Sequence, residues 1–299
     1  MKIRIGFGLG TRASSDGDRF AGLVDSLEEL GFDSLWLSER LTGDCPDPIV
    51  GLSVAAGRTT NLKLGTGVAV LPGRNPVVVA KAWATLDRLS GGRTLPAFGL
   101  GVPDPGEHAA FGVAREERAT WFDEALPLIR RLWSEEVVHH HGPRFHLDGV
   151  RLAPKPLQKP PDVWLGGLAP SELRRIGRLG DGWLASFCTP DDVTRARPVI
   201  EDAAGAAGRA IDPGHWGALV PYLPANTEPP PELVELLRRR RPDVDLGTVI
   251  FTGRPAVRHA VDVFVDAGVS KFVLVPLVEP PSWDDELGEL AATVLPAAR

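Results

Sequence analysis

One stretch in the first third of the chain switches between two hydrophobic periodicities and predicts a complete strand–helix–strand unit. Residues 62–71 (LKLGTGVAVL) have the mainly apolar pattern of a buried strand, and Gly67 interrupts this pattern near its end. Pro76 predicts the first turn of a helix, whose apolar residues recur at helical spacing until the SGG sequence at 90–92. Residues 94–98 then predict a second strand. Two strands joined by a crossover helix form a right-handed parallel unit.

The same unit recurs along the chain. The apolar pattern predicts strands at residues 2–9, 32–37, 62–71, 94–98, 162–165, 182–186, 216–223 and 271–275. Helical periodicity follows them at 18–30, 47–57, 76–89, 115–133, 170–179 and 191–208, with further helices from Pro255 and from about Trp283. Eight strand–helix units in order predict an α/β fold, a closed (β/α)8 TIM barrel. An open doubly wound sheet is the alternative.

We expect one domain, residues 1–299, with two departures from the repeat. An excursion of hairpin character is expected at about 134–161, and a proline-rich insertion at about 224–248. The sequence GVPDPGEH at 101–108 follows the fourth predicted strand. It is rich in turn-forming residues, so we expect a long loop there.

Charge and composition limit the partners. The net charge of −6 argues against nucleic acid or an anionic membrane, because both require clustered basic surface. The densest basic run, Arg238–Arg241, is expected to be a solvated helix end. No apolar run approaches the roughly 18 residues of a membrane-spanning helix, and the chain begins with strand-like sequence. We therefore expect a cytoplasmic protein that acts on a small molecule.

Neither the cysteines nor the histidines predict a metal site. Cys45 and Cys188 lie far apart and form no CxxC motif. His139, His140 and His141 are adjacent, and adjacent residues of a strand point to opposite sides, so they are not expected to bind one ion together. No HxH motif follows the first strand, which disfavours a metal-dependent barrel hydrolase.

The carboxyl ends of the predicted strands are rich in glycine, and this is where barrel enzymes have their active sites. Glycines end the first, third, fourth and fifth predicted strands, so bare main chain would surround a pocket wide enough for a planar ring. The sequence GGLAPS at 166–171 precedes a predicted helix, and its free amides and hydroxyl suit a phosphate. A ring slot and an anion site together indicate a phosphorylated flavin-type cofactor. The alternative is that the glycines only serve tight turns.

Four aromatic residues are candidates for the wall of this pocket: Trp36, Phe98, Phe187 and Tyr222. For Trp36, packing between the barrel and its helices is the alternative.

Several segments together resemble the luciferase-like monooxygenase family, and most closely its branch of oxidoreductases that use coenzyme F420, a deazaflavin. They are GFDSLWLSERL (31–41), LGTGVAVLPGRNPVVVAKAWATLDRLSGGR (64–93), FGLGV (98–102), FDEALPLIRRLW (122–133), GVRLAPKPLQKPPDVWLGGLAPSELRRIGRLGDGWLAS (149–186) and AVDVFVDAGVSKFVLVP (260–276). The similarity is nearly continuous from residue 1 to about 190. It implies the TIM barrel of bacterial luciferase-like proteins, with an excursion after the fourth strand.

The resemblance also implies a set of cofactor-binding residues. A cis peptide bond is expected between Gly67 and Val68, forming a bulge that backs the deazaflavin ring. Gly101 and Val102 would line the ring from the fourth strand. The cofactor phosphate would bind the loop after the fifth strand, through Gly166, Gly167, Leu168, Ala169 and Ser171.

One position departs from the family pattern. Several relatives have an acidic residue followed by histidine at the end of the second strand, whereas this chain has Glu39 and Arg40. An arginine stays charged and cannot carry a proton at neutral pH, so Arg40 is expected to orient an anionic substrate or to stabilise negative charge on the reduced ring. Glu39 or His108 is then the expected proton carrier. The plainer alternatives are a local Glu39–Arg40 ion pair and a solvated His108.

The function implied by the resemblance is hydride transfer between coenzyme F420 and a small organic substrate. The alternatives are an FMN-dependent luciferase-like monooxygenase and, because the usual histidine is absent, a non-catalytic flavin-binding protein. The family pattern also permits a homodimer through the predicted helices at 47–57 and 76–89, although the same apolar residues could simply cover the barrel.

Overall fold

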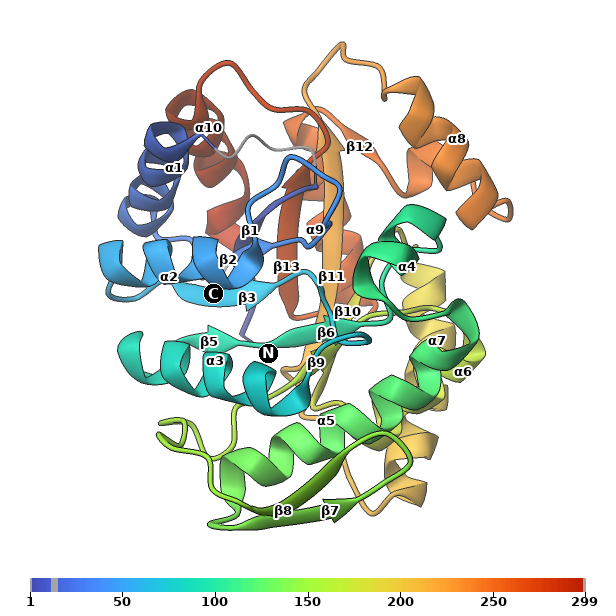
Figure 1. Cartoon of the computed structure of the whole chain (residues 1–299). Helices are drawn as coiled ribbons and strands as arrows, with labels where there is room; N and C mark the ends of the chain where they lie inside the picture. The colour runs from blue at the N-terminus through green and yellow to red at the C-terminus, as the bar shows by residue number, and fades with distance from the viewer. Residues whose placement is uncertain (1, 12–15, 298–299) are drawn as a thin grey trace.

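Parallel strands form a closed ring at the centre of the molecule (Figure 1). The structure is a computed structural model that describes residues 2–11 and 16–297. The strands of the ring are β1 (Arg4–Leu9), β2 (Ser34–Leu37), β3 (Lys63–Thr66), β4 (Ala69–Val70), β5 (Thr94–Leu95), β6 (Ala97–Gly99), β9 (Trp164–Leu165), β10 (Gly182–Ala185), β11 (Trp216–Leu223) and β13 (Lys271–Pro276). A short strand, β12 (Phe251–Thr252), pairs with the end of β11.

The pairing of the strands closes the barrel. The third and fourth strand positions are each split in two, and β3 pairs with β5 while β4 pairs with β6. The sheet continues from β6 through β9, β10, β11 and β13, and β13 pairs with β1. The predicted (β/α)8 TIM barrel is therefore confirmed. The open doubly wound sheet is excluded, because the strand order runs from β4 and β6 through β13 and β1 back to β3 and β5, which are the first halves of the same two strand positions.

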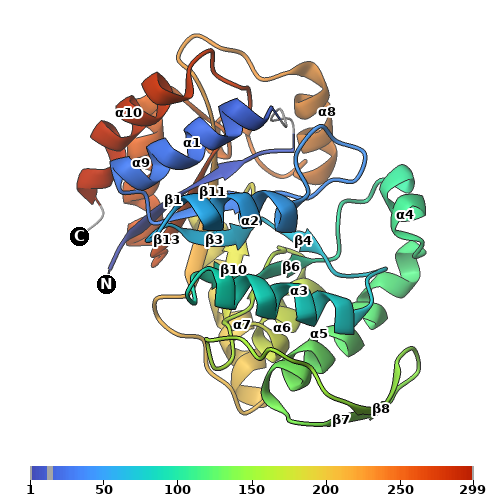
Figure 2. The ribbon, with the colours of Figure 1, turned by 60° about the vertical axis from the view of Figure 1, so that its left-hand side comes forward.

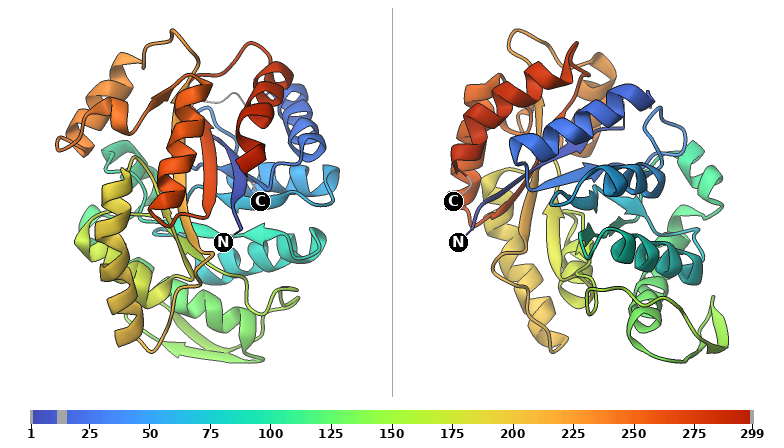
Figure 3. Two further views of the ribbon diagram at one scale, coloured as in Figure 1. Left: turned by 180° about the vertical axis from the view of Figure 1, so that it is seen from behind. Right: turned by 90° about the vertical axis from the view of Figure 1, so that its left-hand side faces the viewer.

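Helices surround this ring (Figures 2 and 3). They are α1 (Gly17–Leu30), α2 (Pro48–Arg58), α3 (Pro76–Leu89), α5 (Arg118–Ser134), α6 (Pro170–Leu179), α7 (Pro190–Ala206), α9 (Arg254–Asp266) and α10 (Trp283–Val294). Their ends follow local sequence rules; for example, Asn75 caps α3 and accepts hydrogen bonds from the amides of Val77 and Val78. Of the helices that the structure describes, none combines the length and the apolar composition needed to span a lipid bilayer.

Two apolar cores lie on the two sides of the strands. The larger core fills the space between the strands and the helices, and the smaller one fills the inside of the barrel. Trp36 belongs to the inner core, where its ring stacks edge-on against Trp164 with centroids 6.3 Å apart. A side chain at Gly65 would place its Cβ 2.5 Å from the Trp36 ring, so this strand position requires glycine. The alternative that Trp36 packs between barrel and helices is therefore wrong.

The predicted hairpin excursion is present. Strands β7 (Val138–His141) and β8 (His146–Val150) pair antiparallel next to α5 (Figure 1). Neighbouring histidines point to opposite sides, since His140 bonds Glu124 at 2.8 Å while His139 and His141 face Asp148 at 3.8 and 3.1 Å. Within the described residues, no group of three or more histidine, cysteine, aspartate or glutamate side chains is arranged to hold a metal ion.

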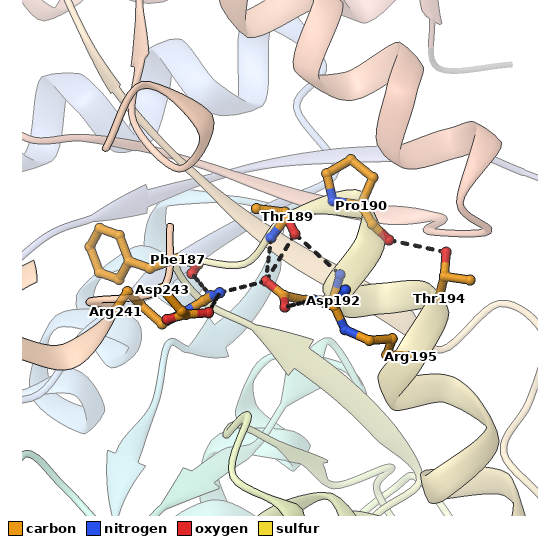
Figure 4. Close-up of polar contacts among 8 residues, drawn as sticks. All are labelled: Phe187, Thr189, Pro190, Asp192, Thr194, Arg195, Arg241 and Asp243. Carbon is orange, nitrogen blue, oxygen red and sulfur yellow. Dashed lines mark hydrogen bonds and ion pairs between the residues drawn. The ribbon is translucent and has the colours of Figure 1, made fainter. Parts of the chain in front are cut away.

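The insertion after β11 contains a helix, α8 (Pro231–Arg240), whose end is bound to the barrel. Arg241 lies buried there, and its guanidinium donates to the Phe187 carbonyl at 2.6 Å and to Asp192 at 2.9 Å (Figure 4). Asp192 also accepts from the amide of Thr189 at the start of α7. The expectation of a solvated basic run is therefore wrong for Arg241, which anchors the insertion to the loop after β10.

The segment after β6 is also more ordered than predicted. Instead of a long loop, the structure has a helix, α4 (Pro105–Phe111), and a 3-10 turn, η1 (Arg115–Glu117). Asp104 caps α4 by accepting from the Glu107 amide at 3.1 Å, and Gly112 ends it with φ 66°. Asp-Pro-Gly has the composition of a turn, but aspartate at the N-cap and proline at the first position also begin a helix.

A lysine–aspartate pair lies inside the barrel at the amino-terminal end of the strands. Lys271 is 1% exposed, pairs with Asp33 and lies 5.5 Å from the centroid of the Trp36 ring. Burial lowers the pKa of Lys271 to about 8, and Asp33 opposes this effect. The pKa of Asp33 is lowered, because the lysine outweighs its own burial. Each partner thus compensates for the burial of the other.

We predict that Asp33→Asn destabilises the fold more than Lys271→Met. Removing the carboxylate leaves a buried ammonium without a partner, which costs about 3–5 kcal/mol, whereas removing the lysine leaves a carboxylate that water reaches. Urea unfolding of both variants and of the double variant measures the difference. Equal losses in the two single variants would contradict this asymmetry, and additive losses in the double variant would contradict a stabilising interaction between the two side chains.

Candidate functional site at the barrel mouth

The strands end in half-exposed residues on one side of the barrel, which we call the barrel mouth. Its main-chain floor consists of Gly67–Val68, Gly99–Gly101 and Gly166–Leu168, all half-exposed, whereas the strand residues just before them are buried. Helices α4 and α8 lie on this side of the ring (Figures 1 and 2). Three glycine-containing segments therefore contribute exposed main chain to this end of the barrel.

A cis peptide bond joins Gly67 to Val68, as the family resemblance implies. It lies between β3 and β4, and the carbonyl of Gly67 accepts a hydrogen bond from Ser38 Oγ at 3.2 Å. The Val68 side chain crosses to the facing strands: a Cβ on Gly99 would lie 2.6 Å from it, and a Cβ on Gly166 would lie 3.5 Å from it. The bulge therefore packs onto glycines of the fourth and fifth strand positions.

The loop after β9 is already occupied by a carboxylate of the chain. Glu172 Oε2 accepts from the amides of Leu168 and Ala169, both at 3.0 Å. The glutamate belongs to the first turn of α6, where it completes the start of the helix. The expectation that these amides are free for a phosphate is therefore wrong, since an anion can bind them only if Glu172 moves away. Binding of cofactor by Gly166, Gly167 and Ser171 stays a prediction.

Glu39 is buried and bound on both oxygens. One oxygen accepts from the Val70 amide at 2.6 Å, and the other pairs with Arg74; the glutamate side chain is 3% exposed. Burial raises the pKa of Glu39, and Arg74 partly opposes this effect. Glu39 thus attaches the end of the second strand to β4.

Arg40 pairs with a different group, so the predicted alternative of a Glu39–Arg40 ion pair is wrong. Its guanidinium bonds Asp104 at 3.1 Å and lies 3.8 Å from Glu107. Glu107 is 3% exposed and accepts from the amides of Leu41 and Thr42 and from the Thr42 hydroxyl, at 3.2, 2.9 and 2.6 Å. We call these contacts between α4 and residues 40–42 the α4 clasp.

His108 is also bound rather than solvated. Its Nε2 lies 3.0 Å from the Val102 carbonyl and accepts from Arg118, the first residue of α5. Arg118 donates to the same carbonyl at 3.2 Å. The structure thus links Arg40 and His108 through α4, while Glu39 belongs to the neighbouring contact with Arg74.

The aromatic residues are placed differently from the expectation. Phe98 and Tyr222 belong to the outer core, where Phe98 packs edge-on against Trp83, so neither walls the mouth. Phe187 lies after β10 in the apolar cluster of α8, with the Arg240 guanidinium 5.8 Å from its ring centroid. Phe98 and Tyr222 face outward because side chains alternate between the two sides of a strand. Ala97 and Gly99, the neighbours of Phe98, face the inside of the barrel, so Phe98 faces the helices.

Five charged residues of this region were not identified from the sequence: Arg74, Asp104, Glu107, Arg118 and Glu172. Except for Glu172, which bonds Leu168 and Ala169, they have partners farther along the chain, as in the contact of Glu107 with residues 41 and 42. Only Asp104 and Glu172 had a local signal, since aspartate before proline and glutamate at the third helical position are typical of a helix start.

The mouth fits a planar ring that has an anionic group. A Cβ added to Gly67 would come no closer than 3.8 Å to other atoms, so the main chain is uncovered at this residue, whereas the Val68 side chain lies against Gly99 and Gly166. A small cavity lined by Gly99 and Gly166 together with Phe98, Phe122 and Ile176 lies on the other side of these strands, toward α5 and α6. The buried guanidinium of Arg118 supplies positive charge next to Gly101. Uncovered main chain at the bulge and a cation are therefore both present.

Comparisons with known proteins agree with this geometry. The sequence profile described as luciferase-like monooxygenase matches residues 2–230. The chain is 31% identical over 216 residues to the F420-dependent glucose-6-phosphate dehydrogenase of Kineococcus radiotolerans, and 32% identical over 209 residues to the F420-dependent hydroxymycolic acid dehydrogenase of Mycobacterium tuberculosis. Each match covers 67% of this chain but only 63% and 57% of those relatives.

Solved structures share the fold over the full length. The coenzyme F420-dependent tetrahydromethanopterin reductase of Methanopyrus kandleri superposes with a TM-score of 0.80, at 20% sequence identity and with all of both chains covered. Identity at this level supports the barrel architecture and leaves the activity to be argued from the site.

We predict that Glu107→Gln opens the α4 clasp. The glutamine amide has one acceptor oxygen for three donors, so at least one of the half-buried hydrogen bonds from residues 41 and 42 is lost, at a cost of about 1 kcal/mol. Hydrogen exchange over residues 101–112 should become faster, and the matched control Glu116→Gln, on an exposed residue nearby, should leave it unchanged.

The clasp should also depend on pH. The hydrogen bonds from Thr42 and Leu41 outweigh burial and lower the pKa of Glu107. Its contribution to stability is therefore complete above the ordinary carboxyl range and is lost as the pH falls through the lowered pKa. Protection of residues 101–112 that is the same in Glu107→Gln and in the unchanged protein at neutral pH would contradict the clasp.

Proposed function

The chain belongs to the luciferase-like monooxygenase family, and on that basis we propose that it is an oxidoreductase using the deazaflavin coenzyme F420. The proposed reaction is hydride transfer between this cofactor and a small organic substrate. Both relatives reported above with more than 30% identity are F420-dependent by name, which supports the deazaflavin over FMN.

The observation that supports the proposal best is the bare main chain of the barrel mouth. Main chain at Gly67–Val68, Gly99–Gly101 and Gly166 is half-exposed where the preceding strand residues are buried, and a Cβ on Gly67 would have no neighbour closer than 3.8 Å. When bound, the deazaflavin supplies a ring carbon that gives or takes a hydride. The residues of the mouth would hold and orient the ring and exclude water, which are the protein's contributions in cofactor enzymes.

Three charged or titratable residues near the mouth, Arg40, Glu39 and His108, are proposed to bind the substrate and to carry the proton. Arg40 keeps its positive charge at all relevant pH values and would orient an anionic substrate or stabilise negative charge next to the ring. Burial favours the protonated form of Glu39, which supports a role in holding a proton, while its contact with Arg74 stabilises the carboxylate. His108 is the second proposed proton carrier, and its Nε2 is accessible only when Arg118 releases it.

A homodimer through α2 and α3 also stays a proposal. Val50, Val54 and Val78 of these helices are between 47% and 66% exposed, which supports it. Sedimentation of the purified protein measures the association state.

The cofactor is tested by titrating the purified protein with oxidised deazaflavin and, separately, with FMN, and by following absorbance. We expect binding of the deazaflavin at micromolar concentration or below. Tight binding of FMN alone would favour the monooxygenase alternative. Absence of binding for both would contradict the proposal.

We predict that Gly166→Ala weakens deazaflavin binding without unfolding the protein. The added Cβ meets Leu184 O and the Val68 side chain at 3.5 Å, an ordinary contact distance, so the fold tolerates it, while it adds bulk beside the Gly67–Val68 bulge. Overpacking of a filled site costs about 1–3 kcal/mol, so the dissociation constant should rise about 10- to 100-fold. Gly205→Ala, on the outer surface of α7 with no atom within 4 Å, is the matched control. An unchanged dissociation constant for Gly166→Ala would place the ring elsewhere.

A further inference from the structure

The hairpin of β7 and β8 has four side chains of metal-binding types on its outer face. His139 and His141 are two residues apart on β7, and His146 and Asp148 are two residues apart on β8. Side chains of a strand alternate between its two sides, so the members of each pair lie on the same side. All four residues are exposed, whereas the residue between the members of each pair is half-buried. The outer face therefore combines three imidazoles with one carboxylate.

The inner face of the same hairpin is fixed to α5 (Figure 1). Glu124 of α5 bonds His140 at 2.8 Å and accepts from the amide of Phe145 at 3.1 Å. The Phe145 ring packs edge-on against Trp121, with centroids 5.4 Å apart. These contacts hold the backbone of the two strands in place, and they involve the side opposite to the outer-face histidines.

The strand register brings the four outer-face residues together. His141 pairs directly with His146, and their rings lie edge-on with centroids 6.1 Å apart. A bulge shifts the register next to this pair, so that the single residue His139 lies opposite both Asp148 and Gly149. The bulge thereby places a second histidine beside the carboxylate.

Two of the histidines already face one oxygen of this carboxylate. Asp148 Oδ1 lies 3.1 Å from Nε2 of His141 and 3.8 Å from Nδ1 of His139. Nitrogen and oxygen ligands bind Zn²⁺ at about 2.0–2.2 Å, so two ligand atoms of one tetrahedral ion lie about 3.3–3.5 Å apart. Both nitrogen–oxygen separations in the hairpin are close to this spacing.

As they stand, the groups bond within the hairpin instead of surrounding a common point. Nδ1 of His139 accepts from the amide of Gly149 at 3.2 Å, and in the described part of the chain no three such side chains are arranged around one centre. The side chains of His139, His141 and Asp148 are 64%, 63% and 78% exposed, so their rotation displaces only water. Binding of an ion therefore requires rotation of exposed side chains and no refolding of the hairpin.

We propose that His139, His141 and Asp148 bind a divalent transition-metal ion on the outer face of the hairpin, with His146 as the fourth ligand. Imidazole and carboxylate are ligands of Zn²⁺ in proteins, and imidazole also suits Cu²⁺ and Ni²⁺. Mg²⁺ and Ca²⁺ require sets of oxygen ligands, which this face does not offer. The ion links the two strands on the side opposite α5. The site lies outside the barrel mouth and is independent of the proposed function.

Calorimetric titration of the purified protein, without a histidine tag, with Zn²⁺ and separately with Mg²⁺ tests the proposal. The variants are His141→Gln and Asp148→Asn, each of which removes one ligand. Two matched controls remove a histidine from elsewhere: His259→Gln on the exposed side of α9, and His140→Gln on the inner face, where the glutamine amide still donates to Glu124. Hydrogen exchange of residues 138–150, with and without Zn²⁺, reports whether the ion binds at the hairpin.

The unchanged protein is expected to bind one Zn²⁺ per chain and no Mg²⁺ at the same concentration. His141→Gln and Asp148→Asn each weaken Zn²⁺ binding at least about tenfold, because even the loss of an outer-shell partner of a metal site has an effect of this size. Both controls bind Zn²⁺ like the unchanged protein. Zn²⁺ slows exchange over residues 138–150, and a chelator reverses this effect.

Three results would overturn the proposal. The first is the absence of Zn²⁺ binding by the unchanged protein. The second is an equal dissociation constant in the unchanged protein, His141→Gln and Asp148→Asn, which would exclude these side chains as ligands. The third is binding that leaves exchange over residues 138–150 unchanged, which would place the ion elsewhere. Circular dichroism of each variant separates loss of a ligand from loss of the fold.

Discussion

Closure of the parallel strands into a ring is the constraint on which the rest of the structure depends. Because β13 pairs with β1 and both halves of the third strand pair with the fourth, all carboxyl ends of the strands point to one side. Inside the ring, Trp36 and Trp164 pack against Leu184, Val273 and Val275 to form the inner core. The cis bond at Gly67–Val68 and the glycines at 99, 101 and 166 thus meet at a single mouth. The site lies where glycines replace bulky inward-facing side chains at the carboxyl ends of the strands.

Polar contacts between distant segments shape this mouth. Glu39 binds the amide of Val70, Glu107 binds residues 41 and 42, and Arg241 binds the loop after β10. Each of these buried groups has its hydrogen-bond partners, as buried polar groups require. Two further charged residues, Glu172 and Arg118, bear on where an anion could bind. Glu172 fills an amide site that suits an external anion, and among the residues that the structure describes no aspartate or glutamate pairs with Arg118.

The strands, most of the helices and the ring of glycines were predictable from the sequence, because their signals are local. Apolar periodicity, proline at helix starts and glycine at strand ends act over a few residues. The position of Arg40 opposite Asp104, of Arg118 opposite His108 and of Glu107 opposite Thr42 depends on how α4 folds back, and α4 itself has the composition of a turn. The outward direction of Phe98 and Tyr222 depends on strand register, which a one-residue shift reverses. Side-chain partners across the barrel were therefore beyond prediction, whereas the location of the site was not.

The central claim is that the glycine-containing floor of the mouth receives a planar ring against bare main chain. A crystal structure of the protein soaked with the deazaflavin tests this claim most directly. The account predicts the tricyclic ring in van der Waals contact with the Gly67–Val68 peptide and with Gly99 or Gly166. A ring bound outside the barrel mouth, with these glycines covered by protein side chains, would contradict it.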